Sequence, residues 1–225
     1  FFIAGKKAYE VERSLRFNRP DNAQLTRTLS SAGNRQKWTW SGWVKITGDS
    51  NENFIFGAAP SGANSVDTYS IINFSANNFR FSVWTGTLRE STAQLRDPNA
   101  WYHLVVIFDS ANSTADDRCI LYINNARVTA LNTNATISQN FETAVNNNIE
   151  HQIGGSGGYS SQAFDGYMAE VNFVEGQAYD PSYFGETDPV TGQWNPRKYT
   201  GSYGTNGFYL NFSDNSGTTA TTLGK

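Results

Sequence analysis

The 225-residue sequence is poor in cysteine, and its one cysteine, Cys119, excludes a disulfide within the chain. Small secreted domains that depend on disulfides carry several cysteines, so the chain is not of that class. We expect Cys119 to be a small buried side chain on a strand. Long apolar runs are missing as well. None approaches the ~18 consecutive residues that a membrane-spanning helix needs, so we expect no membrane partner.

Charge is also scarce in this sequence. Only 16% of the residues are charged, the formal net charge is −3, and no basic run is longer than two residues. Proteins that bind nucleic acid concentrate lysine and arginine on one face, because these side chains neutralise the phosphate backbone. The composition therefore gives no reason to expect nucleic acid as a partner.

Aromatic residues, in contrast, make up 14% of the chain, and apolar side chains recur at every second position. Trp38, Trp40, Val44 and Ile46 share one side of an expected strand, which is the pattern of a half-buried strand. The segment 101–108 (WYHLVVIF) is apolar on both sides. It predicts a central strand that is covered on both faces.

Residues 164–174 alternate in the same way. The alternation predicts a strand whose two faces carry Tyr167, Ala169, Val171 and Phe173 on one side, and Met168, Glu170 and Asn172 on the other. Earlier in the chain, Asn124 and Asn125 are expected to form a tight hairpin turn, because asparagine tolerates positive φ.

Clusters of Gly, Pro, Ser, Asn and Asp separate these segments, and many short strands joined by turns indicate a sandwich or barrel. The one credible helical turn begins at Asp180, with Pro181 at its first position. The rest of residues 177–206 is long and irregular, which is typical of a functional or contact-making segment. We expect an all-β chain in which residues 1–13 are an N-terminal linker or extra strand and residues 14–225 are a single domain.

The order of five segments resembles that of a known family. The segments are Ser41–Lys45, Trp101–Val106, Leu121–Asn125, His151–Gly155 and Phe164–Val171. Their order resembles the laminin-G-like branch of the concanavalin A-like lectin/glucanase superfamily from Ser14 to Phe212. The resemblance implies an antiparallel two-sheet β-sandwich of the jelly-roll kind. At Asn125 the family usually has glycine, but asparagine can adopt the same backbone region, so the expected fold stands.

Shorter segments near the two ends, Ser14–Phe17, Phe184–Glu186 and Tyr199–Leu210, resemble virion proteins of marine bacteriophages. In such proteins the module lies in tail fibres, capsid fibres or decorations. The resemblance implies a non-enzymatic structural protein on the exterior of a phage particle. Its implied partners are other virion proteins, further copies of itself in a homo-oligomer and, through adhesion, host-surface polysaccharide.

An enzyme is the alternative function. Laminarinase-type relatives on this fold carry two glutamates and an aspartate on one strand, and a retaining glycosidase needs its carboxyls ~5–5.5 Å apart. The nearest counterpart joins Glu170, Asn172 and Glu175, with asparagine where the middle acid is needed. His103, in an apolar strand, is most simply a structural histidine. We therefore expect no glycoside hydrolase or depolymerase activity. In the non-catalytic interpretation, Glu170 is an outward polar residue that forms hydrogen bonds to a neighbouring strand or to a partner chain.

Glycan binding needs exposed aromatic side chains that pack on sugar faces and polar groups that bond hydroxyls. Trp84 lies on the side opposite to the apolar row of residues 79–83, so we expect it at the surface. Tyr159 follows a glycine-rich loop, and Asp165 begins the next strand. These three residues are the candidate glycan site. The competing interpretation is that Trp84 packs beneath a loop or against another subunit.

Calcium is the candidate cofactor, because this superfamily often binds it near the rims of the sandwich. Ca²⁺ prefers six to eight oxygen ligands from carboxylates and carbonyls. Asp109, Asp116 and Asp117 bracket one loop and could supply them. The alternative is that these aspartates only form turns in a solvated loop.

Overall fold

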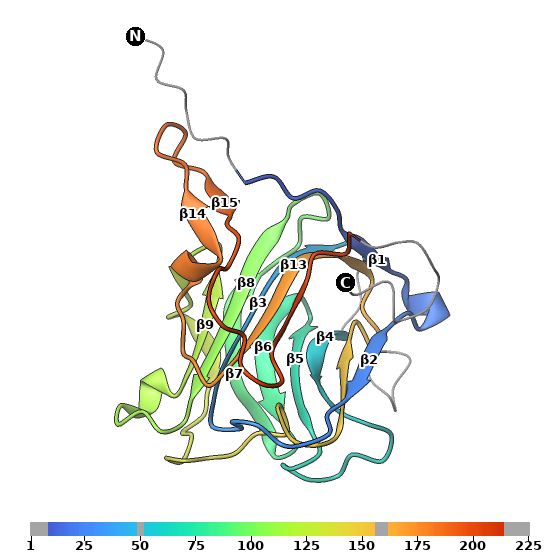
Figure 1. The fold of residues 1–225 in the computed structure, drawn as a ribbon, viewed down its shortest axis with the longest axis vertical. Coiled ribbons are helices and arrows are strands. Elements are labelled where there is room, and N and C mark those ends of the chain that lie inside the picture. The colour runs from blue at the N-terminus through green and yellow to red at the C-terminus, as the bar shows by residue number, and fades with distance from the viewer. Residues whose placement is uncertain (1–8, 49–51, 156–161, 214–225) are drawn as a thin grey trace.

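Two seven-stranded sheets stack face to face in the computed structural model, which describes residues 9–48, 52–155 and 162–213 (Figure 1). Sheet A has the strand order β1-β13-β3-β8-β9-β10, with β16 paired to β13. Sheet B has the order β11-β7-β6-β5-β4-β12-β2. The strand pairs are antiparallel, so the expected all-β, two-sheet sandwich is confirmed.

The strands of sheet A are β1 (Leu15–Phe17), β3 (Lys37–Ile46), β8 (Tyr102–Asp109), β9 (Cys119–Ile123), β10 (Ala126–Arg127), β13 (Gly166–Glu175) and β16 (Phe208–Leu210). Those of sheet B are β2 (Leu25–Thr28), β4 (Glu52–Ala58), β5 (Ser70–Ser75), β6 (Asn78–Val83), β7 (Gly86–Gln94), β11 (Leu131–Asn134) and β12 (Glu150–Ile153). A short separate hairpin consists of β14 (Gly185–Thr187) and β15 (Trp194–Pro196). Single turns of 3₁₀ helix are η1 (Arg19–Asp21), η2 (Ala115–Asp117) and η4 (Pro181–Tyr183). No helix in the described part of the chain is long and apolar enough to cross a membrane.

The core lies between the two sheets and is rich in aromatic rings. Trp38 of β3 stacks on Phe108 of β8 with ring centroids 5.4 Å apart, and Phe81 of sheet B meets Trp38 edge-on at 5.4 Å. Each such side chain stabilises the fold by about 1.5–3 kcal/mol through burial. Trp38, Trp40, Val44 and Ile46 all face this core, so the predicted inward row of β3 is confirmed.

The predicted faces of β13 are wrong, because a β-bulge interrupts the strand. The register with β3 shifts between Ala169 and Asn172, and Glu170 has φ +50°. An extra residue in one strand reverses the alternation of side chains beyond it. Met168 therefore faces the core before the bulge, and Val171 and Phe173 face it afterwards. Tyr167 and Ala169, which were expected to share a face with Val171, lie on the outer side.

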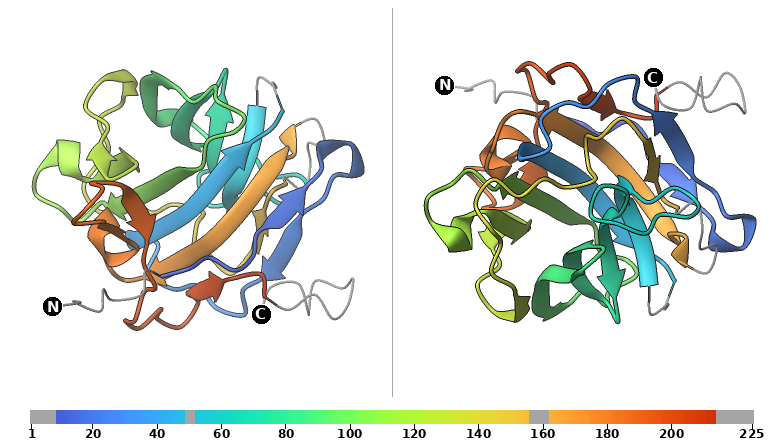
Figure 2. Two further views of the ribbon diagram at one scale, coloured as in Figure 1. Left: turned by 90° about the horizontal axis from the view of Figure 1, so that it is seen from above. Right: turned by 90° about the horizontal axis from the view of Figure 1, so that it is seen from below.

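The outer face of sheet A is partly covered by residues 177–206, which we call the arm. Figures 1 and 2 show it, coloured orange to red, alongside β8 and β9. Val105 and Ile107 on that face of β8 are buried, which confirms a central strand covered on both sides. The expected helical turn is the 3₁₀ turn η4, where the Asp180 side chain accepts a hydrogen bond from the Ser182 amide at 2.8 Å.

The β9–β10 hairpin also follows the sequence. Asn124 and Asn125 have φ values of 48° and 69°, the left-handed pair that a tight two-residue hairpin turn requires. In the adjoining β9, Cys119 is buried in the core, as expected. Burial raises the pKa of its thiol to about 12, while the charge of Arg89 opposes the increase.

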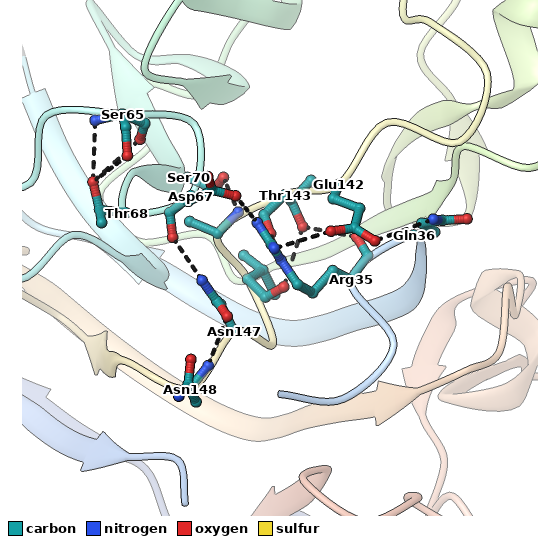
Figure 3. A network of polar contacts seen from close by, with 12 residues as sticks. Arg35, Gln36, Ser65, Asp67, Thr68, Ser70, Glu142, Thr143, Asn147 and Asn148 are labelled. Carbon is teal, nitrogen blue, oxygen red and sulfur yellow. Dashed lines mark hydrogen bonds and ion pairs between the residues drawn. The ribbon is translucent and has the colours of Figure 1, made fainter. Parts of the chain in front are cut away.

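Arg35 joins several loops at one end of the sandwich (Figure 3). Its guanidinium pairs with Asp67 at 2.5 Å and with Glu142 at 3.0 Å, and its Nε–H donates to the Thr143 carbonyl at 2.7 Å. The Thr143 hydroxyl oxygen in turn accepts a hydrogen bond from the Trp38 indole at 3.1 Å. These contacts tie the loops at this end to the core.

Candidate functional site

The best candidate site is an open groove of about 390 Å³ on the outer face of sheet A. Three tryptophans line it: Trp43 of β3, Trp101 immediately before β8, and Trp194 of β15. Trp101 is 36% exposed, and the other two are half-buried. The remaining walls are residues 11–14, Ala169 of β13, and Gln193, Asn195 and Pro196 of the arm. We call this feature the tryptophan groove.

The strand geometry explains why Trp43 faces outward. Trp40 and Val44 point to the core, so the residue immediately before Val44 points to the opposite face. In the sheet, Trp43 lies between His103 of β8 and Ala169 of β13. The Trp43 ring stacks on the His103 imidazole with centroids 5.0 Å apart.

His103 is the buried centre of the contacts beneath the groove. The Trp194 indole N–H donates to His103 Nδ1 at 3.0 Å, and His103 Nε2 lies 2.9 Å from Ser41 Oγ. Because an indole can only donate, Nδ1 is the acceptor, and the neutral ring carries its proton on Nε2 and donates to Ser41. Burial lowers the pKa of His103 to about 3, so the ring is neutral around pH 7. The imidazole thus holds two of the three tryptophans in place.

The groove wall formed by residues 11–14 belongs to the segment 9–14, which we call the N-terminal strap. Tyr9 donates a hydrogen bond to Glu170 Oε2 at 2.9 Å, and Tyr209 of β16 donates to the same oxygen at 2.8 Å. The two phenol oxygens are 3.0 Å apart. Burial raises the pKa of Glu170, and the hydrogen bonds from Tyr209 and Tyr9 oppose that shift. Glu170 therefore anchors the strap across sheet A.

The carboxylates that could have formed a hydrolytic pair have separate structural partners. Glu170 is only 5% exposed beneath Tyr9 and Tyr209. Glu175 accepts hydrogen bonds from the backbone amides of Asn34 at 2.9 Å and Asn206 at 2.8 Å. Burial alone would raise the pKa of Glu175, but these amides hold it below its usual value. Glu170 thus accepts a hydrogen bond from the neighbouring strand β16, in agreement with the non-catalytic interpretation.

The structure does not bring Trp84 and Asp165, two of the predicted glycan-binding residues, together. Trp84 follows β6 and is 48% exposed, with Tyr69 edge-on at 6.0 Å. Asp165 pairs with Arg16 at 2.7 Å, and its amide donates to Asn53 Oδ1 at 3.3 Å. Pairing through β5 puts Trp84 near the Ala58 end of β4, whereas Asn53 is at the other end. Tyr159 lies outside the described residues.

The three predicted calcium ligands do not lie in one site, although Asp109 and Asp117 line the same groove. Asp109 pairs with Lys37 at 2.9 Å, and Asp117 pairs with Arg127 at 2.5 Å. Asp116 lines a different depression from the other two. Among the described residues, no group of three or more His, Cys, Asp or Glu side chains could hold a metal ion. These aspartates therefore do not fit a calcium site in this arrangement.

Sequence reasoning missed the tryptophan groove, although one signal for it was present. Trp43 falls on the polar side of its strand, with Thr39, Ser41 and Lys45, and a large aromatic residue there indicates a covered or binding surface. Trp101 and Trp194 carried no such signal. Their segments are 93 positions apart in the chain and meet only through the fold.

A family model described as the concanavalin A-like lectin/glucanases superfamily matches residues 19–182. No curated protein matches the chain in sequence. Among solved structures, the heptameric SAP-like pentraxin from Limulus polyphemus is similar, with 15% identity and a TM-score of 0.55 over 76% of this chain and 80% of that one.

Two further structures share the fold. Domains LG4-5 of the mouse laminin alpha1 chain have 12% identity and a TM-score of 0.53 over 92% of this chain and 50% of that one. The binding domain of Botulinum neurotoxin serotype D has 13% identity and a TM-score of 0.50 over 75% and 40%. The chain therefore spans half of the laminin fragment and less of the neurotoxin domain. At these identities the likenesses show the fold alone.

Proposed function

This chain belongs to the concanavalin A-like lectin/glucanases superfamily, and from that membership we propose that it is a non-enzymatic carbohydrate-binding module. Its ligand lies in the tryptophan groove. The observation that carries the proposal is the convergence of Trp43, Trp101 and Trp194 on one open groove. Sugar rings have apolar faces that pack on aromatic side chains, and hydroxyls that bond polar groups.

The polar walls of the groove suit this ligand. Glu12 and Arg13 of the strap are exposed on one side, and Gln193 and Asn195 of the arm lie on the other. Carboxylate, guanidinium and amide groups supply both donors and acceptors for hydroxyls. Since the acid and the base balance, the lining favours a neutral saccharide over a strongly charged one.

The rigidity of the groove also supports binding. A site that is already formed pays less entropy on association than one that must be ordered by its ligand. Trp43 and Trp194 are both held by His103, which is itself fixed by Ser41. The aromatic wall is thus in place before a ligand arrives.

A glycan array with neutral oligosaccharides, followed by titration of tryptophan fluorescence, tests the proposal. Trp101→Ala and Trp194→Ala should each weaken binding by about tenfold or more, because each removes one aromatic platform. Trp84→Ala, an exposed tryptophan outside the groove, is the matched control and should bind as the parent does. Loss of binding in Trp84→Ala with full binding in Trp101→Ala would move the site to the β6–β7 end.

The non-enzymatic part of the proposal is supported by the state of Glu170. A retaining glycosidase needs two carboxyls that both reach the sugar. Glu170 is covered by Tyr9 and Tyr209, and the next outward residue on the strand is Asn172. Incubation with β-glucans, with measurement of reducing ends, should show no release. Release that disappears in Glu170→Gln would overturn this part.

The cellular setting that we propose is the exterior of a bacteriophage particle, in a homo-oligomer with virion partners. The support is the resemblance of Ser14–Phe17 and Tyr199–Leu210 to marine phage virion proteins. Two of the motifs, Phe184–Glu186 and Tyr199–Leu210, lie in or overlap the arm that shapes the tryptophan groove. Mass spectrometry of purified particles should find the chain among virion proteins. Its absence from particles of the phage that encodes it would refute this setting.

A further inference from the structure

A second groove, of about 480 Å³, lies beside the first part of the arm. Its walls come from strands β8, β9 and β10, from the loop between β8 and β9, and from residues 178–183. We call it the tyrosine groove, after Tyr179 and Tyr183. It shares no lining residue with the tryptophan groove, so the two are separate sites.

The aromatic wall of the tyrosine groove is a stacked pair. The rings of Tyr179 and Tyr183 are parallel to within 20°, with centroids 4.0 Å apart. The Tyr179 amide donates to Thr39 Oγ1 at 2.9 Å, and Asp180 caps η4 through the Ser182 amide at 2.8 Å. Tyr183 is 44% exposed, so part of a fixed ring remains open to a ligand.

The charge of the tyrosine groove differs from that of the tryptophan groove. Asp109, Asp117 and Asp180 line it, with Arg127 as the opposing charge. Arg127 pairs with Asp117, and Lys37 pairs with Oδ2 of Asp109. Asp109 Oδ1 is buried without a hydrogen-bond partner in the described part of the chain. Within that part, no basic side chain pairs with Asp180.

Asp117 and Asp180 come from different segments of the chain and line the same groove. Burial raises the pKa of the neighbouring Tyr122, the charge of Arg127 opposes the shift, and Asp180 and Asp117 add to it. Two carboxylates from different segments thus act on the same hydroxyl. The Asp180 carboxylate accepts hydrogen bonds from the amide and the hydroxyl of Ser182, and these neutral donors leave its negative charge in place. A carboxylate of this kind beside the face of an exposed aromatic ring attracts a cation, because both groups present negative potential.

We propose that the tyrosine groove binds the ammonium group of an amine-bearing saccharide, of which a glucosamine unit is the simplest example. The ammonium meets Asp180 and the exposed face of the Tyr183 ring, and Ile120 offers apolar surface to the sugar ring. Both grooves lie on the outer side of sheet A, where the proposed function puts saccharides. The inference does not need the tryptophan groove to be occupied.

Titration calorimetry with tetramers of glucosamine and of N-acetylglucosamine tests the inference. At about pH 6 the free amines are charged, since this is below the ordinary pKa of an amine. The N-acetylated tetramer has no charge and should bind this groove at least about tenfold more weakly. Tyr183→Ala and Asp180→Asn should each weaken binding of the glucosamine tetramer by about tenfold. Asparagine also caps helices well, so Asp180→Asn removes the charge and keeps the turn.

Two controls separate this site from the first. Asp21→Asn makes the same charge change on η1, outside both grooves, and should not alter binding of the glucosamine tetramer. Trp101→Ala should leave that binding intact, even if it abolishes binding of neutral sugars. Equal affinity for the two tetramers in the Trp101→Ala variant, where the first groove is disabled, would overturn the inference. Full affinity for the glucosamine tetramer in both Tyr183→Ala and Asp180→Asn would overturn it as well. Trilysine that binds as tightly as the glucosamine tetramer would overturn the saccharide class.

Discussion

The inner and outer faces of sheet A are built from the same strands and differ in what covers them. On the inner face, Trp38 and Trp40 of β3 are completely buried against sheet B. On the outer face, Trp43 of the same strand is half-buried beneath an arm with little regular structure. The inner contacts are mainly ring against ring, whereas the outer ones combine ring stacking with hydrogen bonds to His103 and Glu170.

This difference shows that the covering layer determines whether an aromatic side chain stabilises the fold or is open to a ligand. A second sheet presents a continuous apolar face, so it excludes water, and the aromatic surface that it buries stabilises the fold. An arm such as residues 177–206 covers only part of the surface, and it leaves grooves with polar and aromatic walls. The same residue type therefore stabilises the fold on one side and is free for recognition on the other.

The largest expected effect contrasts a tryptophan from each face. Trp38→Ala should lower the free energy of unfolding by about 3–5 kcal/mol, because it leaves a cavity beside Phe81 and Phe108. Trp101→Ala, at an exposed position, should cost about 1 kcal/mol or less. Urea unfolding measures both. Equal losses in the two variants would mean that the outer face contributes to stability as the inner face does.

Acid should weaken the outer face through His103. Its pKa is lowered by burial to about 3, while an exposed histidine in the unfolded chain has 6.5. The stability that this neutral ring contributes is present above 6.5 and is lost as the pH falls towards 3. Between about pH 7 and about pH 5 the loss from His103 alone should be about 2 kcal/mol.

Urea unfolding at several pH values measures this loss. His151, whose pKa burial lowers to about 4, adds a loss of the same sign. His103→Gln keeps a hydrogen-bond donor and an acceptor. It should remove only the part of the pH dependence of the unfolding free energy that comes from His103. An unchanged pH dependence in His103→Gln would show that the imidazole is not neutral and buried in the folded protein.

The smallest effect concerns the strap. Tyr9→Phe removes one hydrogen bond to Glu170 and should cost about 0.5–1.5 kcal/mol of stability. Amide hydrogen exchange should become faster in residues 11–14, and sugar binding in the tryptophan groove should weaken. Tyr183→Phe, which removes a hydroxyl from an exposed ring, is the control and should change neither. Exchange in residues 11–14 that is no faster in Tyr9→Phe than in the parent would show that β1 alone holds the strap.

The fold was predictable where the signal is local. Alternation along residues 38–46 identifies the inner face of β3, because a strand turns every second side chain the same way. The same reasoning failed over residues 164–174, since the bulge at Glu170 has no glycine to mark it. Nothing in the sequence around Glu170 distinguishes a bulged residue from an ordinary outward one.

The candidate site was harder to predict, because it is assembled from distant segments. Trp84 was correctly expected at the surface, yet exposure alone does not gather partners around a side chain. Trp101 and Trp194 meet because the arm folds back on β8 and bonds to His103. Such long-range docking depends on the packing of the finished sandwich, and no short motif encodes it.

The buried thiol of Cys119 in β9 is a built-in probe for opening of the core. Alkylating reagents react with a thiolate, and Cys119 keeps its proton because its pKa is raised to about 12. Because the chain has no other cysteine, all thiol alkylation is at this position. The rate of alkylation at Cys119 therefore reports how often the two sheets separate. A bound sugar or a substitution that stabilises the sandwich should lower that rate.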